Sequence, residues 1–153
     1  MLPQGVKRME NLIPVLLIGL AGGVAVGLQG PLTSLMSQRI GTMESVFIIH
    51  LGGAILAGAI VLGMKGGNLG AWRSVPWYAL GAGVLGLVVL SAVSYTIPRI
   101  GAATTVTLLI VAQLVASTLL DHFGLLGTSV RLLDPARVLG IAVLFAGTWL
   151  IMR

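Results

Sequence analysis

Hydrophobic residues in this chain fall into five long runs, separated by short stretches that are rich in polar residues, glycine and proline. Each run approaches the ~20 residues that an α-helix needs to cross a hydrocarbon core of about 30 Å. The pattern therefore predicts an all-α membrane protein with five transmembrane helices, forming a single membrane domain over residues 1–153. The expected helices cover residues of about 12–38, 43–64, 76–97, 101–121 and 135–152.

An odd number of spans places the two termini on opposite faces of the membrane. Two copies inserted upside-down to each other would make a ten-helix unit with pseudo-two-fold symmetry, an architecture common among secondary transporters. Six basic residues then lie on the face of the N-terminus and three on the other, a modest excess that favours a cytoplasmic N-terminus. This balance fits either a dual-topology homodimer or a fixed chain paired with an inverted paralogue. The two sets are Lys7, Arg8, Lys65, Arg73, Arg131 and Arg137, and Arg39, Arg99 and Arg153.

Composition argues against a soluble protein, because only 8 % of the residues are charged and 57 % are hydrophobic, whereas soluble domains carry about 25 % charged residues. The absence of cysteine excludes a disulfide scaffold and cysteine-based metal or nucleophile chemistry. Basic residues stand singly at helix ends, as snorkelling anchors do, and do not form a face for nucleic acid. Lys7 and Arg8 precede an apolar run as in a signal peptide, but that run is long and lacks a cleavage motif. We expect it to remain in the protein.

The first helix is expected to begin after Asn11, with Pro14 in its first turn, where a missing N–H group is not needed. Pro31 removes the N–H group that would bond to the Gly27 carbonyl, which predicts a kink in a helix that reaches Arg39. Gly19, Gly23 and Gly27 on the first helix are spaced four residues apart, which lets another helix approach closely in lipid. These three glycines are therefore expected dimer-packing positions.

Two turns on the face opposite the N-terminus share the letters R-I-G, at Arg39–Gly41 and at Arg99–Gly101. Each glycine suits the C′ position that ends a helix, and the preceding arginine can bond the last carbonyl groups. The pattern indicates two similar helical hairpins followed by a lone fifth helix. Arg39 and Arg99 are therefore expected to be structural.

Four segments follow one another in a distinctive order: Leu90-Ser91-Ala92-Val93, Ile97-Pro98-Arg99-Ile100-Gly101-Ala102-Ala103, Ala112-Gln113-Leu114 and Leu120-Asp121-His122-Phe123-Gly124-Leu125. In sequence and order they are similar to the bacterial YdcZ-like family of the drug/metabolite transporter (DMT) superfamily. Members of that family are five-helix proteins, and the resemblance implies inverted pairing into a ten-helix unit in the bacterial inner (cytoplasmic) membrane. It also implies that the fifth helix helps to join the two halves, with Gly140 and Gly147 as dimer-packing positions. Many relatives carry no acid at the start of the second helix, so the resemblance supplies no coupling role for Glu44.

Ionisable residues inside spans are costly and usually face a cavity or a partner, so Glu44 and His50 are candidate functional residues. Glu44 in the first turn of the second helix is either a dipole and capping group, with Thr42 as the cap, or a carboxylate that couples transport to protons or binds a cation. His50 lies ~9 Å further along the helix on another face. It either bonds to a neighbouring helix as a neutral ring or relays protons and contacts substrate.

Uncharged polar residues form stripes on three helices, which suggests a common cavity, although interhelical hydrogen bonds of about 0.6 kcal/mol each would also explain them. Gln29 stands beside Gly30 and Pro31, where a disturbed helix can expose backbone groups to substrate. The substrate candidates are Gln29 and Thr33, then Ser91, Ser94 and Tyr95, and then Gln113, with Ser37 and Ser117 on the same stripes.

Asp121 and His122 at the end of the fourth helix are expected to be structural, with the carboxylate bonding loop N–H groups or an arginine such as Arg131. No nucleophile–base set, metal-ligand spacing or phosphate-binding loop is present in the sequence. These patterns argue against an enzyme, a cofactor or a metal site.

The leading interpretation is a secondary transporter, in the exporting direction, for a small organic solute of cationic or amine character. Alternating access would operate at the interface of an inverted dimer, driven by protons through Glu44 with help from His50. The expected partners are the lipid bilayer, a second inverted copy or paralogue, the solute and protons, and no nucleic acid. The alternative is a non-transporting membrane subunit that assembles or regulates another complex.

Overall fold

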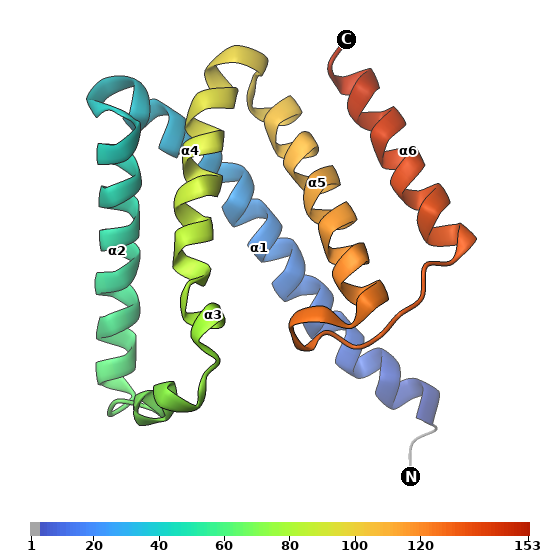
Figure 1. Ribbon diagram of the computed structural model, residues 1–153, viewed down its shortest axis with the longest axis horizontal. Coiled ribbons are helices and arrows are strands. Elements are labelled where there is room, and N and C mark those ends of the chain that lie inside the picture. The colour runs from blue at the N-terminus through green and yellow to red at the C-terminus, as the bar shows by residue number, and fades with distance from the viewer. Residues whose placement is uncertain (1–3) are drawn as a thin grey trace. The chain divides into compact units, whose positions relative to one another are not determined.

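The computed structural model describes the backbone of residues 4–153 and the side chains of residues 12–153. Every regular element in this part of the chain is helical (Figure 1). The chain divides into two compact units, Met1–Ser94 and Tyr95–Arg153, and each is considered separately. The fold class is therefore all-α.

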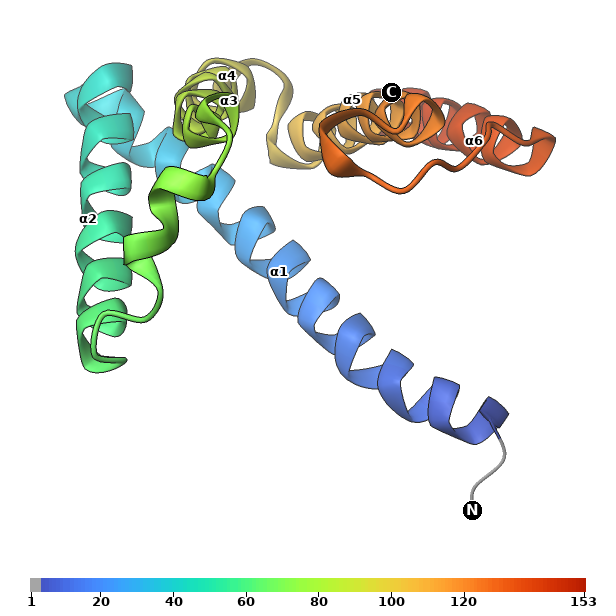
Figure 2. The ribbon, with the colours of Figure 1, turned by 60° about the horizontal axis from the view of Figure 1, so that its bottom comes forward.

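The first unit holds a long helical hairpin, a loop and most of a third long helix. Helices α1 and α2 are joined by a single residue, Gly41, and they diverge away from this turn (Figures 1 and 2). Because the turn is so short, the two helices pack mainly beside it. The elements in order are α1 (Gln4–Ile40), α2 (Thr42–Gly63), the 3₁₀ helix η1 (Leu69–Ser74), α3 (Trp77–Leu80) and α4 (Ala82–Ile100).

The expected start of α1 after Asn11 is wrong, because the helix begins at Gln4 and Pro14 lies inside it. Proline removes one hydrogen bond, to the residue four positions earlier, while the neighbouring N–H groups keep theirs. The helix therefore continues on the N-terminal side of Pro14, back to Gln4. At its other end α1 runs through Pro31 as one element to Ile40.

Small side chains form the contact between α1 and α2. Thr33 and Ser34 on α1, and Ser45 and Val46 on α2, are each at most 1 % exposed. Small residues let helix backbones approach closely in a membrane, where packing and hydrogen bonds, rather than the hydrophobic effect, hold helices together. The buried hydroxyl groups bond locally: Thr33 Oγ1 donates to the Gln29 carbonyl oxygen and Ser45 Oγ to that of Thr42.

The two R-I-G turns have nearly the same backbone geometry. Gly41 has φ 101° and ψ 156°, and Gly101 has φ 81° and ψ 163°. This region is essentially restricted to glycine, and it differs from the left-handed helical conformation expected for a C′ residue, which has ψ near +47°. The helices that follow, α2 and α5 (Ala102–Phe123), are both 22 residues long. The hairpin similarity therefore extends from the letters to the backbone.

The third predicted helix, over residues of about 76–97, is interrupted at Gly81 and ends later than expected, at Ile100. Glycine has a low preference for helix interiors, and the Gly81 N–H group bonds back to the Tyr78 carbonyl oxygen at 3.2 Å, which closes the short helix α3. Pro98 removes one hydrogen bond near the end of α4 without stopping it.

In the second unit, α5 and α6 (Pro135–Ile151) lie side by side and antiparallel, joined by a loop that contains η2 (Leu125–Gly127) (Figures 1 and 2). The Arg131 N–H group donates to the Asp121 carbonyl oxygen at 2.9 Å, which ties this loop to the end of α5. Asp134 caps α6 by accepting a hydrogen bond from the Arg137 N–H group at 2.8 Å, and a proline follows the cap.

Four helical segments in the described part of the chain are long and apolar enough to cross a membrane. The fifth predicted span corresponds to α6, which has 17 residues and a length of about 25 Å, at the lower limit for a hydrocarbon core of about 30 Å. A fifth crossing thus stays a prediction. The four spans are Leu12–Ile40, Thr42–Gly63, Trp77–Ile100 and Ala102–Phe123.

Candidate functional site

His50 lies half-buried on α2 and faces α4, within the first unit. Its Nδ1 atom is 2.8 Å from the Val46 carbonyl oxygen. A carbonyl oxygen only accepts hydrogen bonds, so in the neutral ring Nδ1 carries the hydrogen and Nε2 carries the free lone pair. A Cβ atom at Gly86 would stand only 2.9 Å from Nε2. The proton-accepting nitrogen therefore lies next to Gly86 of α4.

Glu44 is exposed in the first turn of α2, and its carboxylate folds back over Gly41, in the space that a side chain at residue 41 would enter. In the described part of the chain the carboxylate has no hydrogen bond or ion pair. It lies beside the apolar side chains of Met43, Phe47 and Ile48 on the same open face of α2. This position leaves the carboxylate open to a proton or a cationic group.

The expected capping role of Thr42 is wrong. Gly41 occupies the N-cap position of α2, with no side-chain cap, and the Thr42 hydroxyl instead pairs with Ser37 Oγ at 2.9 Å. Glycine supplies no capping side chain at the N-terminus of α2. The interaction that stabilises this end is therefore the attraction between the Glu44 carboxylate and the positive end of the helix dipole. The Ser37–Thr42 pair connects the two helices across the turn.

A groove in the first unit, of about 430 Å³, brings together two of the predicted substrate residues, Gln29 and Thr33. The Thr33 hydroxyl is used within α1, since it donates to the Gln29 carbonyl oxygen at 2.8 Å. The Gln29 side-chain amide has no hydrogen-bond partner within residues 12–153. Its two donors and its acceptor are thus free for a ligand or a partner helix. The remaining lining residues are Ala25, Leu28, Leu32 and Met36 of α1 and Ile49 of α2.

On α4, the three predicted residues have different surroundings. Ser91 is half-buried, and Ser94 is 4 % exposed with a hydroxyl group that has no partner in the described chain. Tyr95 is exposed, and the Arg99 guanidinium carbon lies 3.6 Å from its ring centroid while Arg99 also donates to the Tyr95 carbonyl oxygen. Tyr95 and Arg99 thus form a cation–π pair over the last turn of the helix.

On α5, Gln113 is exposed and its side chain has no partner among the described residues. Thr105 is a polar residue that sequence reasoning missed: it is 2 % exposed, and its hydroxyl group is unpaired in the same part of the chain. Thr105 stands four residues after Gly101, as Ser45 stands four residues after Gly41. The shared turn motif was the available signal. Gly86 was also missed, and no sequence signal identifies it, because its role depends on the contact with His50.

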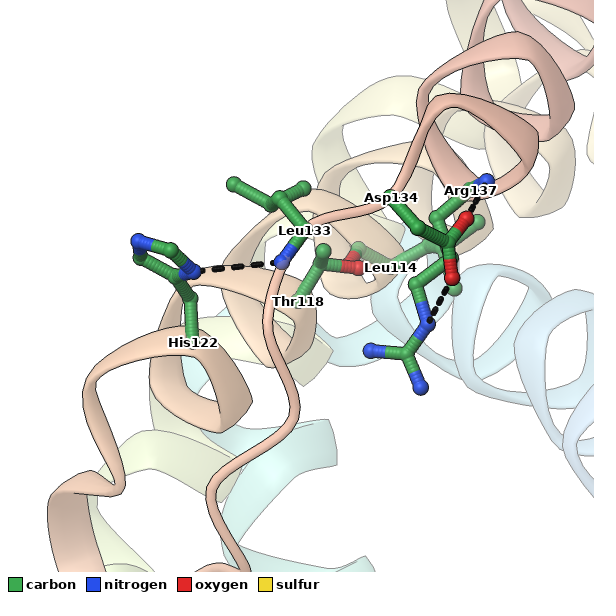
Figure 3. Close-up of polar contacts among 6 residues, drawn as sticks. All are labelled: Leu114, Thr118, His122, Leu133, Asp134 and Arg137. Carbon is green, nitrogen blue, oxygen red and sulfur yellow. Dashed lines mark hydrogen bonds and ion pairs between the residues drawn. The ribbon is translucent and has the colours of Figure 1, made fainter.

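The structural residues at the loop end of α5 differ in part from expectation. His122 Nδ1 accepts a hydrogen bond from the Leu133 N–H group at 3.2 Å (Figure 3), and the ring stacks edge-on against Phe123, with centroids 4.9 Å apart. The expected contact of the Asp121 carboxylate with loop N–H groups or Arg131 is absent from the described chain. Asp121 holds the Arg131 N–H group through its main-chain carbonyl oxygen instead.

The expected packing glycines are uncovered within a single chain. A Cβ atom added at any of them would meet nothing within 4 Å. Arg39 is exposed at the end of α1, and no cluster of three potential metal ligands occurs among the described residues. The glycine positions are Gly19, Gly23 and Gly27 on α1 and Gly140 and Gly147 on α6.

Comparison with known proteins places this arrangement in a family. Residues 14–150 match the model of the DMT_YdcZ family, whose description is "Putative inner membrane exporter, YdcZ". The chain belongs to this family. It is also 28 % identical to the inner membrane protein YdcZ of Escherichia coli (strain K12) over 137 residues, which cover 88 % of this chain and 91 % of the relative. No solved structure matches the chain.

The predicted membership of the YdcZ-like family is confirmed by these two matches. The protein is a multi-pass protein of the bacterial inner membrane, and the description of its family is consistent with a transporter. Membership of the YdcZ family identifies neither a solute nor an energy source. The surroundings of Glu44, His50 and Gln29 are therefore the structural basis for proposing them.

Proposed function

We propose that this YdcZ-family protein is a secondary exporter of a small organic solute, built from two copies in inverted orientation. Alternating access would exchange two equivalent conformations of the pair, with the solute near the membrane midplane. Each chain would then be one half of the transporter. Surfaces that are uncovered in a single chain would be covered by the other copy.

The observation that carries the proposal is that polar groups within the spans lack partners in a single chain. The Gln29 amide lines a groove without a hydrogen bond in the described residues, and the Ser94 hydroxyl is buried and unpaired. Unsatisfied polar groups cost several kcal/mol each in hydrocarbon. A ligand or an opposing subunit that supplies hydrogen bonds removes this cost, and the open glycine positions of α1 offer the counterpart a close approach.

Protons are the proposed driving ion, and two side chains of the first unit are proposed to bind them. His50 Nε2 has a free lone pair beside Gly86 of α4, so its protonation adds a positive charge and an N–H group at the point where α2 reaches toward α4 through this ring. The Glu44 carboxylate is unpaired and next to the hairpin turn. A solute cation and a proton that compete for one carboxylate would give antiport, because only one of them occupies it at a time.

Reconstituted protein provides the test. Proteoliposomes with an acidic interior, monitored by an internal pH dye, are challenged with a panel of quaternary ammonium ions, polyamines, amino acids and sugars. Solute-dependent proton flux is expected for at least one cationic compound. Glu44→Gln should abolish this flux and leave the dimer intact. The matched control is Asp134→Asn, which removes an equal charge and keeps a side chain able to cap α6.

Two outcomes would contradict the proposal. Unchanged proton-coupled flux in Glu44→Gln would remove that carboxylate from the mechanism, while transport by an inverted pair would stand. Absence of flux with every solute, by protein that remains folded and dimeric, would instead favour a non-transporting assembly or regulatory subunit.

A further inference from the structure

A groove of about 370 Å³ runs between α5 and α6, within the second unit. Its far end is apolar, formed by Leu114 on α5 and by Ile141 and Leu144 on α6, and its other end carries Asp121 and Arg137. Leu114 and Asp121 are separated by about two helical turns, or ~10 Å along the axis. The charged end lies where both helices meet the loop, so the groove passes from an ionic mouth to an apolar interior.

The two charges at the mouth are not satisfied by each other or by their neighbours. The Asp121 carboxylate has no hydrogen bond or ion pair in the described chain. Arg137 Nε lies 3.9 Å from Asp134 Oδ2, and these side chains are 32 % and 56 % exposed (Figure 3). An ion pair that is long and exposed contributes little. The guanidinium donors and the carboxylate oxygens therefore remain available.

We propose that this groove binds a zwitterionic aminophospholipid, of which phosphatidylethanolamine is the probe. Its phosphate matches the planar donors of Arg137, and its ammonium group matches the Asp121 carboxylate. One acyl chain follows the apolar wall of Leu114, Ile141 and Leu144. A lipid with both charges in its head group fits a mouth with both charges, whereas an anionic lipid leaves the carboxylate unpaired.

The size of the groove is that of a small-ligand site. Its volume of about 370 Å³ lies within the range of about 300–1,000 Å³ found for such sites. Gly140 leaves open space in the wall, because an added Cβ there meets nothing within 4 Å.

Native mass spectrometry of the delipidated dimer tests this assignment, with phosphatidylethanolamine, phosphatidylcholine and phosphatidylglycerol added in turn. Retention of phosphatidylethanolamine over the other two is expected by about tenfold, since charge-assisted hydrogen bonds select it. Asp121→Asn should remove the preference for the ammonium lipid. Arg137→Gln should weaken all three. Glu44→Gln and Arg73→Gln remove equal charges at residues that do not line the groove, and they should change neither result.

Two glycine-to-leucine substitutions test lipid binding by blocking space, without any change of charge. Gly140→Leu fills the groove and should abolish lipid retention, while Gly58→Leu places the same side chain at an equally open glycine of α2 and should not. The soluble head group, glycerophosphoethanolamine, should bind much more weakly than the lipid. Equal binding of head group and lipid, or full lipid retention by Gly140→Leu, would overturn the proposal. A loss of dimer in Gly140→Leu with retention unchanged would assign the groove to a second copy.

Discussion

Replacement of Gly86 by alanine isolates the contact between His50 and α4. A new Cβ atom at residue 86 would lie 2.9 Å from His50 Nε2, where ordinary contact begins at 3.4 Å, so the ring must retreat by about half an ångström. Gly83, one turn earlier on the same helix, has nothing within 4 Å of an added Cβ. Gly83→Ala is therefore the matched control, because both substitutions gain the same helix propensity of about 1 kcal/mol.

The difference between these variants can be worked out from the structure. Retreat of the ring forces His50 from its rotamer, at about 0.5–1.5 kcal/mol. It also disturbs the Nδ1 bond to the Val46 carbonyl oxygen, which contributes about 0.5–1.5 kcal/mol. Gly86→Ala should consequently be less stable than Gly83→Ala by roughly 1–3 kcal/mol, or about 5- to 150-fold in the unfolding equilibrium.

Equilibrium unfolding in mixed detergent micelles, followed by far-ultraviolet circular dichroism, measures this difference. In a His50→Ala background the clash disappears, so the gap between the two alanine variants should close, as a double-mutant cycle requires. Equal stability of Gly83→Ala and Gly86→Ala with His50 present would refute the argument that Nε2 is held against α4. A gap that persists without His50 would refute it as well.

Three further outcomes are expected. Gly101→Ala should lower the unfolding free energy by about 1–3 kcal/mol in the same assay, because its backbone is restricted to glycine; an unchanged value would contradict the turn geometry. Asp134→Ala should cost about 1 kcal/mol and speed hydrogen exchange in the first turn of α6, and Asp134→Asn should restore both. Since the chain has no cysteine, Arg153→Cys in sealed membrane vesicles of one orientation gives a sidedness test: an impermeant maleimide should label about half of the chains if two copies pair in inverted orientation, and complete or absent labelling would exclude an inverted pair of this chain.

Element ends show where sequence reasoning is strong and where it is weak. The two R-I-G motifs located the turns after α1 and α4, because a glycine with positive φ terminates a helix through local backbone chemistry. The last helical residues were missed, since α1 runs to Ile40 and α4 to Ile100, whereas the helices were expected to end near residues 38 and 97. The start of α1 at Gln4 and the break at Gly81 were not predicted. Proline and glycine change the helix preference by a few kcal/mol at most, and neighbouring hydrogen bonds decide whether the helix continues.

Polar residues show the same division. Sequence placed Gln29 and Thr33 on one helix face, since both recur at helical spacing, and the structure places both on one groove. Sequence also placed Glu44 and His50 on different faces, but the surroundings of each depend on what packs there. The His50 ring lies against Gly86, which belongs to another helix. The Glu44 carboxylate occupies the space left by the missing side chain of Gly41.

The sequence by itself determined that the chain is helical and lies in the membrane, because the bilayer thickness and the need to satisfy every backbone group leave uninterrupted apolar runs almost no other structure. It also determined the family, through motifs that keep their order along the chain. Only the tertiary structure decided that His50 Nε2 faces Gly86 and that Asp121 and Arg137 share a groove. Helices far apart in sequence pack through the shape of small side chains, and no local pattern records which faces will meet.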